Sequence, residues 1–89
     1  MITKRMEIKI PTGLDPSTIA LFIQTASQYD SRVYVEVENK KVNAKSIMGM
    51  MTLGLDNGED ITIVANGGDE QEAIDGIEEY LTNPEKQSK

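Results

Sequence analysis

A regular alternation of apolar and polar residues constrains the fold of this chain more than any other feature of its sequence. Residues 5–10 and residues 32–37 both place an apolar side chain at every second position. Because successive side chains of a β-strand point to opposite faces of a sheet, both stretches predict half-buried strands. The residues expected to face inward are Met6, Ile8, Ile10, Val33, Val35 and Val37. A sheet with one apolar face needs a second layer on that face only.

The rest of the chain predicts three helices and two more strands. Asp15 followed by Pro16 predicts a helix that ends near Tyr29, because Asp is a favoured N-cap and Pro a favoured first helical residue. Asp69 with Glu72 three residues later predicts a capping box for the last helix. The apolar stripes of these two helices are Ile19, Phe22, Ile23 and Ala26, and Ala73, Ile74, Ile77 and Leu81.

Further strands are expected at residues 41–44 and 60–65, and the second of these is apolar enough to lie in the centre of the sheet. A short helix is expected after Ser46. The resulting order is β-α-β-β-α-β-α. It predicts an α+β fold in which a four-stranded antiparallel sheet carries three helices on one face.

Length and composition limit the kind of protein. The 89 residues predict a single domain over residues 1–82 and a polar, frayed tail over residues 83–89. The chain contains no cysteine and no histidine, so neither thiol chemistry nor a phosphorylated histidine can be part of its function. No run of residues is long and apolar enough to span a membrane. The protein is therefore expected in the cytoplasm and away from membranes.

The charge of the chain opposes binding to nucleic acid. The net charge is −6, and the sequence contains one phenylalanine, three tyrosines and no tryptophan. A negative protein repels phosphates, and so few aromatic residues provide no platform on which bases stack. Direct binding to DNA or RNA is not expected.

The stretch from Ser46 to Leu55 carries no charge, although 27% of all residues are charged. Ser46 stands where an N-cap hydroxyl would accept a free backbone N–H of a short helix. At helical spacing the stretch forms two apolar stripes, which are Ile47, Met50 and Gly54 and, beside them, Met48, Met51 and Leu55. A small domain is not expected to bury both stripes, so an exposed methionine-lined patch is predicted here.

Two interpretations of Ser46 follow from its position. It can be an ordinary helix N-cap, which is what most such serines are. It can also be a phosphorylation site, because a phosphate is favoured at the positive end of a helix dipole. In that case free backbone N–H groups and Lys45, Lys40 or Lys41 could stabilise the added charge.

The segment Val42-Asn43-Ala44-Lys45-Ser46-Ile47-Met48-Gly49 resembles the regulatory-serine segment of the HPr family, the small phosphocarriers of the bacterial sugar phosphotransferase system. The resemblance extends from about Met6 to Leu81. Only the active-site loop departs from it, because the family's Gly-x-His-x-Arg-Pro is here Gly13-Leu14-Asp15-Pro16-Ser17-Thr18. Asp15 stands in place of the carrier histidine and Ser17 in place of its arginine. The chain is therefore most similar to the Crh type of HPr-like protein, which keeps the serine and lacks the histidine.

The resemblance implies an open-faced β-sandwich and a regulatory function without enzymatic activity or cofactor. It implies that a bifunctional HPr kinase/phosphorylase phosphorylates Ser46, with ATP and Mg²⁺ held by the kinase. The phosphoserine form would then act as corepressor of a LacI-type catabolite control transcription factor, which itself holds the DNA. Ile47, Met48 and Met51 match the patch through which HPr-like proteins dock, and Lys45 adds a positive charge beside it.

Two other functions remain open from the sequence. Asp15, besides its interpretation as an N-cap, is a candidate phosphoryl acceptor for a carrier that works through an acyl phosphate. The fold can also serve as a docking module that is never phosphorylated. A homodimer that exchanges strands around the hinge Pro11-Thr12-Gly13 is conceivable. The acidic residues of the last helix are interpreted as its solvated face and not as a metal site, and these are Glu70, Glu72, Asp75, Glu78 and Glu79.

Overall fold

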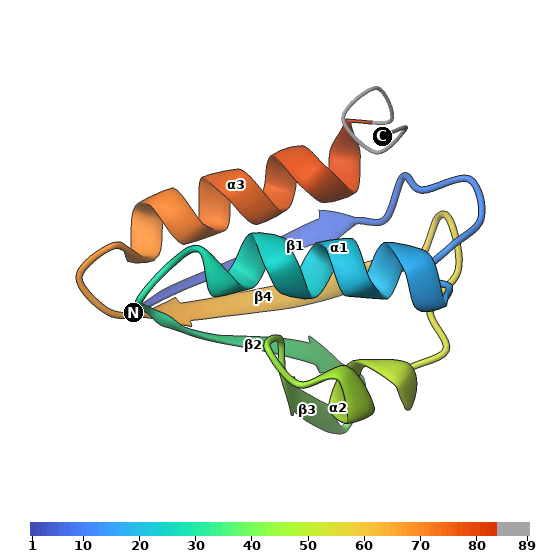
Figure 1. Ribbon diagram of the computed structural model, residues 1–89, viewed down its shortest axis with the longest axis horizontal. Helices are drawn as coiled ribbons and strands as arrows, with labels where there is room; N and C mark the ends of the chain where they lie inside the picture. The colour runs from blue at the N-terminus through green and yellow to red at the C-terminus, as the bar shows by residue number, and fades with distance from the viewer. Residues whose placement is uncertain (84–89) are drawn as a thin grey trace.

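The computed structural model describes residues 1–83 and contains the seven predicted elements in the predicted order (Figure 1). The elements are β1 (Ile2–Glu7), α1 (Pro16–Ser27), β2 (Arg32–Val37), β3 (Lys40–Asn43), α2 (Ile47–Met51), β4 (Asp60–Asn66) and α3 (Glu70–Thr82). The order β-α-β-β-α-β-α is thereby confirmed.

The four strands form one sheet in the order β1-β4-β2-β3, and every neighbouring pair is antiparallel. β4 lies in the interior of the sheet between β1 and β2, as its apolar sequence predicts. The three helices lie on the same side of this sheet, in front of it in Figure 1. The other side faces solvent, so the predicted open-faced sandwich with a single layer of helices is confirmed.

Strand register decides which residues face the helices. Ile61 and Ile63 of β4 pair with Met6 of β1 and Val35 of β2, and all four side chains are buried beneath the helices. Thr62 lies on the opposite, open face, because neighbouring residues of a strand point to opposite sides. The largest fully buried side chains of the core are Phe22, Ile8, Ile10, Met50, Ile61, Ile63, Ile74, Ile77, Leu81, Val33 and Val35.

The first strand begins and ends earlier than predicted, at Ile2 and Glu7 instead of residues 5 and 10. Ile8 and Ile10 are still buried, but their segment leaves the pairing with β4. The N–H of Ile8 donates to the carbonyl of Glu59, and the N–H of Lys9 donates to the carbonyl of Leu81 at 2.8 Å. The alternating burial therefore continues beyond the strand, because these bonds hold the segment against Glu59, just before β4, and Leu81 of α3.

The third strand is shifted by one residue, to Lys40–Asn43, and α1 ends at Ser27 instead of near Tyr29. The predicted start of α1 is confirmed, because Pro16 is its first residue and Asp15 its N-cap.

The capping box predicted for the last helix is wrong. Asp69 is the N-cap residue of α3, but its side chain makes no capping hydrogen bond. Its carboxylate instead accepts hydrogen bonds from the N–H groups of Asp30 and Ser31, at 2.8 and 2.9 Å, and from the Ser31 hydroxyl. The Ser31 hydroxyl is the main cause that lowers the pKa of Asp69 below its ordinary value of 3.8. Asp69 thus ties α3 to the loop after α1, a contact across 39 residues that no local motif predicts.

The C-terminal end of α3 lies close to the predicted domain boundary. The N–H of Asn83 donates to the carbonyl of Glu79 at 3.0 Å, so Asn83 caps the helix. The remainder of the predicted tail, residues 84–89, lies outside the described residues.

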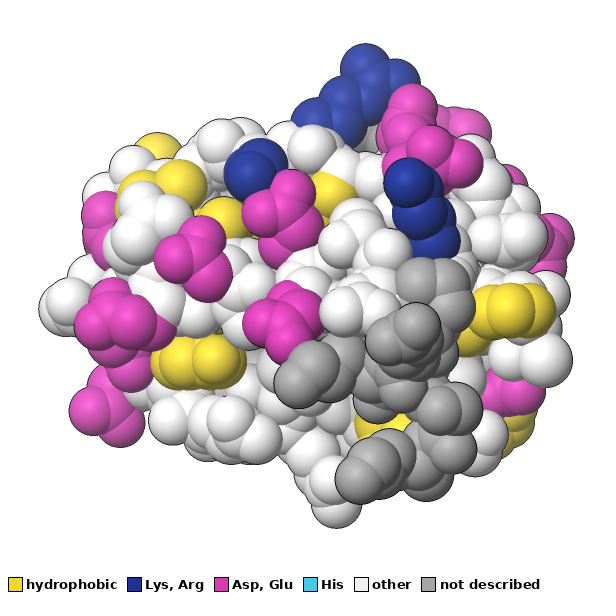
Figure 2. All heavy atoms as spheres, turned by 90° about the horizontal axis from the view of Figure 1, so that it is seen from above, with side chains coloured by type: hydrophobic (Ala, Val, Ile, Leu, Met, Phe, Trp, Pro, Cys, Tyr) yellow, Lys and Arg dark blue, Asp and Glu magenta, His cyan; other side chains and the backbone are white. Residues whose placement is uncertain are grey.

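Acidic side chains outnumber basic ones in this chain, 15 to 9. On the face seen from above Figure 1, magenta Asp and Glu side chains lie among small, separate apolar areas (Figure 2). Along α3, Glu72, Asp75 and Glu79 are exposed, while Glu70 and Glu78 form ion pairs with the N-terminal amine and Lys4 at 3.1 and 2.8 Å. These carboxylates therefore behave as the solvated face of the helix.

Candidate functional site

Ser46 starts α2 in the way its sequence position predicts. Its backbone is extended, with φ −106° and ψ 115°, and its hydroxyl oxygen accepts a hydrogen bond from the N–H of Gly49 at 3.3 Å. Its carbonyl accepts the first helical bond, from the N–H of Met50. The N-cap interpretation is therefore confirmed. The residue is half-buried, and the capping bond uses the oxygen as an acceptor, so the hydroxyl proton stays free to leave in a substitution at oxygen.

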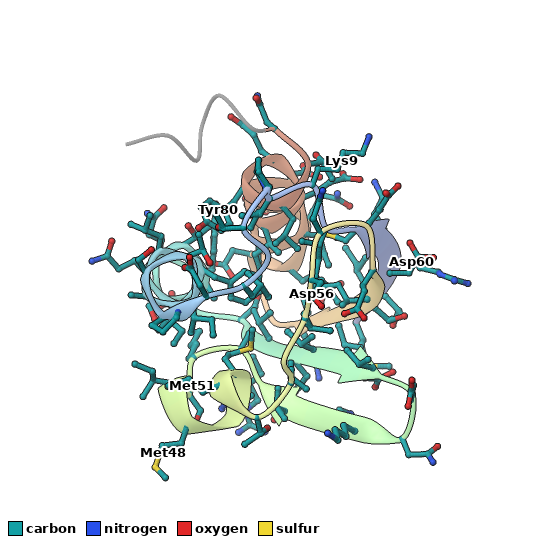
Figure 3. The ribbon with its side chains drawn as sticks, turned by 90° about the vertical axis from the view of Figure 1, so that its right-hand side faces the viewer. Lys9, Met48, Met51, Asp56, Asp60 and Tyr80 are labelled. Atoms are coloured by element: carbon teal, nitrogen blue, oxygen red, sulfur yellow. The ribbon has the colours of Figure 1, made fainter. Side chains whose placement is uncertain are left out.

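α2 exposes three large apolar side chains. The exposed fractions are 53% for Ile47, 78% for Met48 and 54% for Met51. Met48 extends from α2 away from the sheet and from the other helices (Figure 3). We call these three residues the α2 patch. Apart from Met1, they are the only large hydrophobic side chains exposed within residues 1–83.

The division of the segment into two stripes was wrong in detail. Met50 is completely buried and Leu55 is 4% exposed, so each predicted stripe contains one core residue. For Leu55 the reason is that α2 has only five residues and ends at Met51. At Gly54 the backbone turns through a positive φ of 58°, after which Leu55 enters the core. Helical spacing therefore applies to residues 47–51 and not to residue 55.

Lys45 does not direct its charge toward the hydroxyl of Ser46. Its ammonium group donates a hydrogen bond to the carbonyl of Tyr29 at 2.7 Å, just beyond the end of α1. Lys41 lies 4.9 Å from the centre of the Tyr34 ring and 3.7 Å from Glu36. Both lysines thus have other partners in the unphosphorylated chain, and stabilisation of a phosphate on Ser46 by Lys45, Lys40 or Lys41 stays a prediction. Lys45 instead links the start of α2 to the loop after α1.

The loop before α1 forms a helix cap around one carboxylate oxygen of Asp15. One carboxylate oxygen of Asp15 accepts from the N–H of Thr18 at 2.9 Å, and from the hydroxyls of Thr18 and Ser17, each at 3.0 Å. These bonds favour the ionised form, and the Thr18 N–H is the largest cause of a pKa below the ordinary value of 3.8. Within residues 1–83 no lysine or arginine forms an ion pair with Asp15.

Two tertiary contacts support this loop. Gly13 has a φ of +70°, and a Cβ there would lie 2.8 Å from the carbonyl oxygen of Leu55, so the loop and the segment after α2 approach each other closely. Tyr80 of α3 is almost buried, and its hydroxyl donates to the carbonyl of Thr18 at 3.0 Å. Burial and the nearby charge of Asp15 raise the pKa of Tyr80 above 10.0.

Sequence reasoning missed both Tyr80 and the contact between Lys45 and Tyr29. Tyr80 stands three residues after Ile77 and seven after Ala73, so its helical spacing places it on the buried stripe. No comparable signal exists for Lys45, because its partner is a backbone carbonyl in another loop.

Two classes of site are absent from the part of the chain that the structure describes. Residues 1–83 contain no cluster of three or more Asp, Glu, His or Cys side chains arranged to hold a metal ion. No helix among them is long and apolar enough to cross a membrane.

Comparison with known proteins relates this chain to one family. Residues 2–83 match the family model described as the PTS HPr component phosphorylation site. The chain is 43% identical over 81 residues to the HPr-like protein Crh of Halalkalibacterium halodurans. The aligned residues cover 91% of this chain and 96% of the relative.

Two solved structures show the same fold. The crystal structure of HPr-C-His from Thermoanaerobacter tengcongensis matches with a TM-score of 0.90 and 46% identity over 94% of both chains. The crystal structure of Crh from Bacillus subtilis matches with a TM-score of 0.75 and 42% identity over 94% of this chain and 97% of that one, and it is described as a swapped, intertwined dimer. The family model and the relative together cover nearly all of the described residues, so this chain belongs to the HPr family.

Proposed function

We propose that this chain is a regulatory HPr-like protein of the Crh type, switched by phosphorylation of Ser46. The phosphate would come from ATP through an HPr kinase/phosphorylase. The phosphoserine form would act in the cytoplasm as corepressor of a LacI-type catabolite control transcription factor. The observation that carries the proposal is the position of the Ser46 hydroxyl directly beside the exposed α2 patch.

A phosphate on Ser46 would change the surface without disturbing the core. The hydroxyl makes a single capping bond of 3.3 Å, and only Met50 among the residues of α2 is buried. A phosphoserine carries a charge of about −1.5 to −2 and three acceptor oxygens. A partner with a basic pocket next to an apolar groove would therefore read the phosphate and the α2 patch together, through charge-assisted hydrogen bonds and apolar burial.

Phosphoryl transfer through Asp15 is less well supported. Its engaged oxygen accepts three hydrogen bonds, and their effect is to stabilise the carboxylate within the helix cap. Phosphoryl transfer depends on positive groups that stabilise the transferring phosphate. Asp15 forms no ion pair with such a group in residues 1–83, and Ser17 occupies the position of the family's arginine.

Two phosphoryl donors distinguish the candidate functions. The purified chain is incubated with HPr kinase/phosphorylase and ATP–Mg²⁺, and separately with phosphoenolpyruvate and the first enzyme of the phosphotransferase system. Intact mass and acid stability are then measured. The proposed regulator gains one acid-stable phosphate from ATP only, whereas a carrier through Asp15 gains a phosphoenolpyruvate-dependent label that hydroxylamine removes. A passive docking module gains neither.

Ser27→Ala is the matched control for Ser46→Ala. Ser27 is exposed at the end of α1 and has no part in the capping of either helix. Ser46→Ala is expected to lose the label and Ser27→Ala to retain it. Label that persists in Ser46→Ala would exclude Ser46 as the switch.

The docking role of the α2 patch has its own test. Met48→Glu and Met51→Glu are expected to weaken binding of the phosphorylated chain to the transcription factor while the unfolding free energy stays nearly unchanged, because both side chains are exposed. A variant that binds as tightly as the parent would remove that side chain from the proposed interface.

Self-association through exchange of β1 is a further part of the proposal. The hinge would be Pro11–Gly13, which connects β1 to the rest of the domain. In the monomer the N–H of Gly13 donates to the carbonyl of Ile10 at 2.8 Å and that of Leu14 donates to Leu55 at 2.9 Å. Exchange would have to open the first of these contacts, because it spans the hinge, whereas the second lies within the part of the domain that stays in place. Light scattering after size exclusion, at increasing protein concentration, would detect the dimer.

A further inference from the structure

The methionines of this chain fall into two clearly separated classes. Met48, Met51 and Met1 are 78%, 54% and 77% exposed, whereas Met6 and Met50 are 5% and 0% exposed. Two of the three residues of the α2 patch are therefore accessible thioethers, and the buried Met50 lies between them in the same short helix. Figure 3 shows Met48 at the outer edge of the molecule.

We propose that Met48 and Met51 form an oxidation site that switches the α2 patch from apolar to polar. The oxidant would be a peroxide. A sulfur lone pair attacks one peroxide oxygen, the O–O bond breaks and an S–O bond forms. The sulfur loses two electrons and becomes a sulfoxide, while the peroxide is reduced to water or an alcohol. Reductases that act on each sulfoxide epimer reverse the step, with two thiols oxidised to a disulfide and one water released.

The position of the two sulfurs determines the consequence. A sulfoxide is polar and accepts hydrogen bonds strongly, so it opposes transfer from water into an apolar groove. Ile47 alone would keep an apolar side chain in the α2 patch. The fold would remain intact, because α2 is anchored in the core by Met50, which is completely buried. Oxidation would therefore act on docking, and this consequence rests on the function proposed above.

The first experiment tests the site without any partner. The native chain is exposed to a graded series of hydrogen peroxide, and each methionine is followed by peptide mass. Met48 and Met51 are expected to oxidise at least about tenfold faster than Met6 and Met50, because oxidation follows exposure. Met1, exposed and outside the patch, sets the rate of a freely accessible methionine. Equal rates at Met48 and Met50 would overturn the proposal.

The second experiment tests the change of surface. Retention on a hydrophobic-interaction column is measured before and after oxidation and after treatment with both reductases and a thiol. Oxidised protein is expected to elute earlier and reduced protein at the original position. The double variant Met48→Leu/Met51→Leu keeps an apolar patch that peroxide cannot modify, and Met1 is then the one exposed methionine left, so the retention of this variant should shift far less than that of the parent. Unchanged retention of the oxidised parent would also overturn the proposal.

The third experiment connects the site to docking. Binding of the Ser46-phosphorylated chain to the transcription factor is expected to weaken at least about tenfold on oxidation, and binding of the double leucine variant is expected to resist peroxide. Equal binding of oxidised and reduced parent would overturn the switch. If the reduced, phosphorylated parent does not bind at all, the proposed function fails, while the first two experiments still decide whether the oxidation site exists.

Discussion

α1 and α2 both begin with a side-chain N-cap, but the two caps are built differently. In both, the side-chain oxygen of the N-cap residue accepts a hydrogen bond from the N–H three residues later. Asp15 accepts that bond at 2.9 Å and two hydroxyl donors in addition. Ser46 accepts one bond at 3.3 Å. α1 then continues for 12 residues over the sheet, whereas α2 stops after five.

The two caps differ in how many partners the capping side chain has and in what surrounds it. One carboxylate oxygen of Asp15 accepts three hydrogen bonds, and the Tyr80 hydroxyl of α3 donates to the carbonyl of Thr18 in the same turn. The Ser46 oxygen accepts one bond of 3.3 Å, and Ile47, Met48 and Met51 after it are exposed. The first cap is organised to hold a helix in place. The second leaves a hydroxyl with one hydrogen-bond partner beside the α2 patch.

The largest effect that separates the two caps is expected from Ser46→Ala. It should abolish ATP-dependent phosphorylation by the kinase, because alanine has no oxygen to accept a phosphate. Asp15→Ala should be phosphorylated as the parent is. Intact mass after incubation decides between them, and a comparable loss in both variants would mean that the first cap also serves recognition.

Two methionines of α2 are expected to differ strongly in their contribution to the free energy of unfolding. Met50→Ala should lower the free energy of unfolding by about 2–5 kcal/mol, because it removes a completely buried side chain and leaves a cavity. Met48→Ala should change it by no more than about 0.5 kcal/mol, because that side chain is exposed. Urea unfolding of the two variants measures the contrast. Similar losses would place Met48 in the core and outside the docking surface.

The two caps should also contribute differently to the stability of the domain, but this effect is smaller than that of Met50→Ala. Asp15→Ala is expected to lower Tm by about 4–8 °C, the usual consequence of a lost side-chain cap in a domain of this size. Ser46→Ala should lower Tm by clearly less, because its cap bond is longer and the helix it starts is short. Equal shifts, measured by circular dichroism at the same pH, would contradict the division between a structural and an accessible cap.

The smallest expected effect is a loss of stability in acid. The folded protein lowers the pKa of Asp15 and Asp69 below 3.8 and that of Glu70 below 4.5, through hydrogen bonds from Thr18, Ser31 and Gly67 respectively. A carboxyl whose pKa is lower when folded adds stability above its unfolded pKa and loses it as the pH falls through the folded value. Urea midpoints should therefore stay level down to about pH 5 and decline below it.

Asp15→Asn sharpens this measurement, because it removes one of the three titrating groups while keeping an oxygen that can accept from Thr18. Its acid decline should be shallower than that of the parent. Ser46→Ala removes no titrating group, so its decline should run parallel to that of the parent. A parallel decline for Asp15→Asn would show that the charge of Asp15 adds nothing to the stability of the folded protein.

Much of the fold could be predicted because the signals are local. Pro16 after Asp15 marks the start of α1, and the alternation around Val33 and Val35 marks a strand, each within a few residues. The predicted capping box failed for a different reason. Asp69 looks like the first half of a capping box, yet its carboxylate binds Asp30 and Ser31 instead. The deciding donors lie 38 and 39 residues away in sequence, so no local pattern contains them.

The candidate site divides in the same way. From the sequence alone, the absence of histidine excludes a histidine carrier, Ser46 is a helix cap, and the segment after it contains more apolar residues than one helix face can bury. Only the tertiary structure decided which of them face water. Met50 is buried while Met48 and Met51 are exposed, and Lys45 is bound to the carbonyl of Tyr29. Capping and periodicity depend on bonds between near neighbours, whereas exposure and the partner of a long side chain depend on how α2 is placed against α1 and β3.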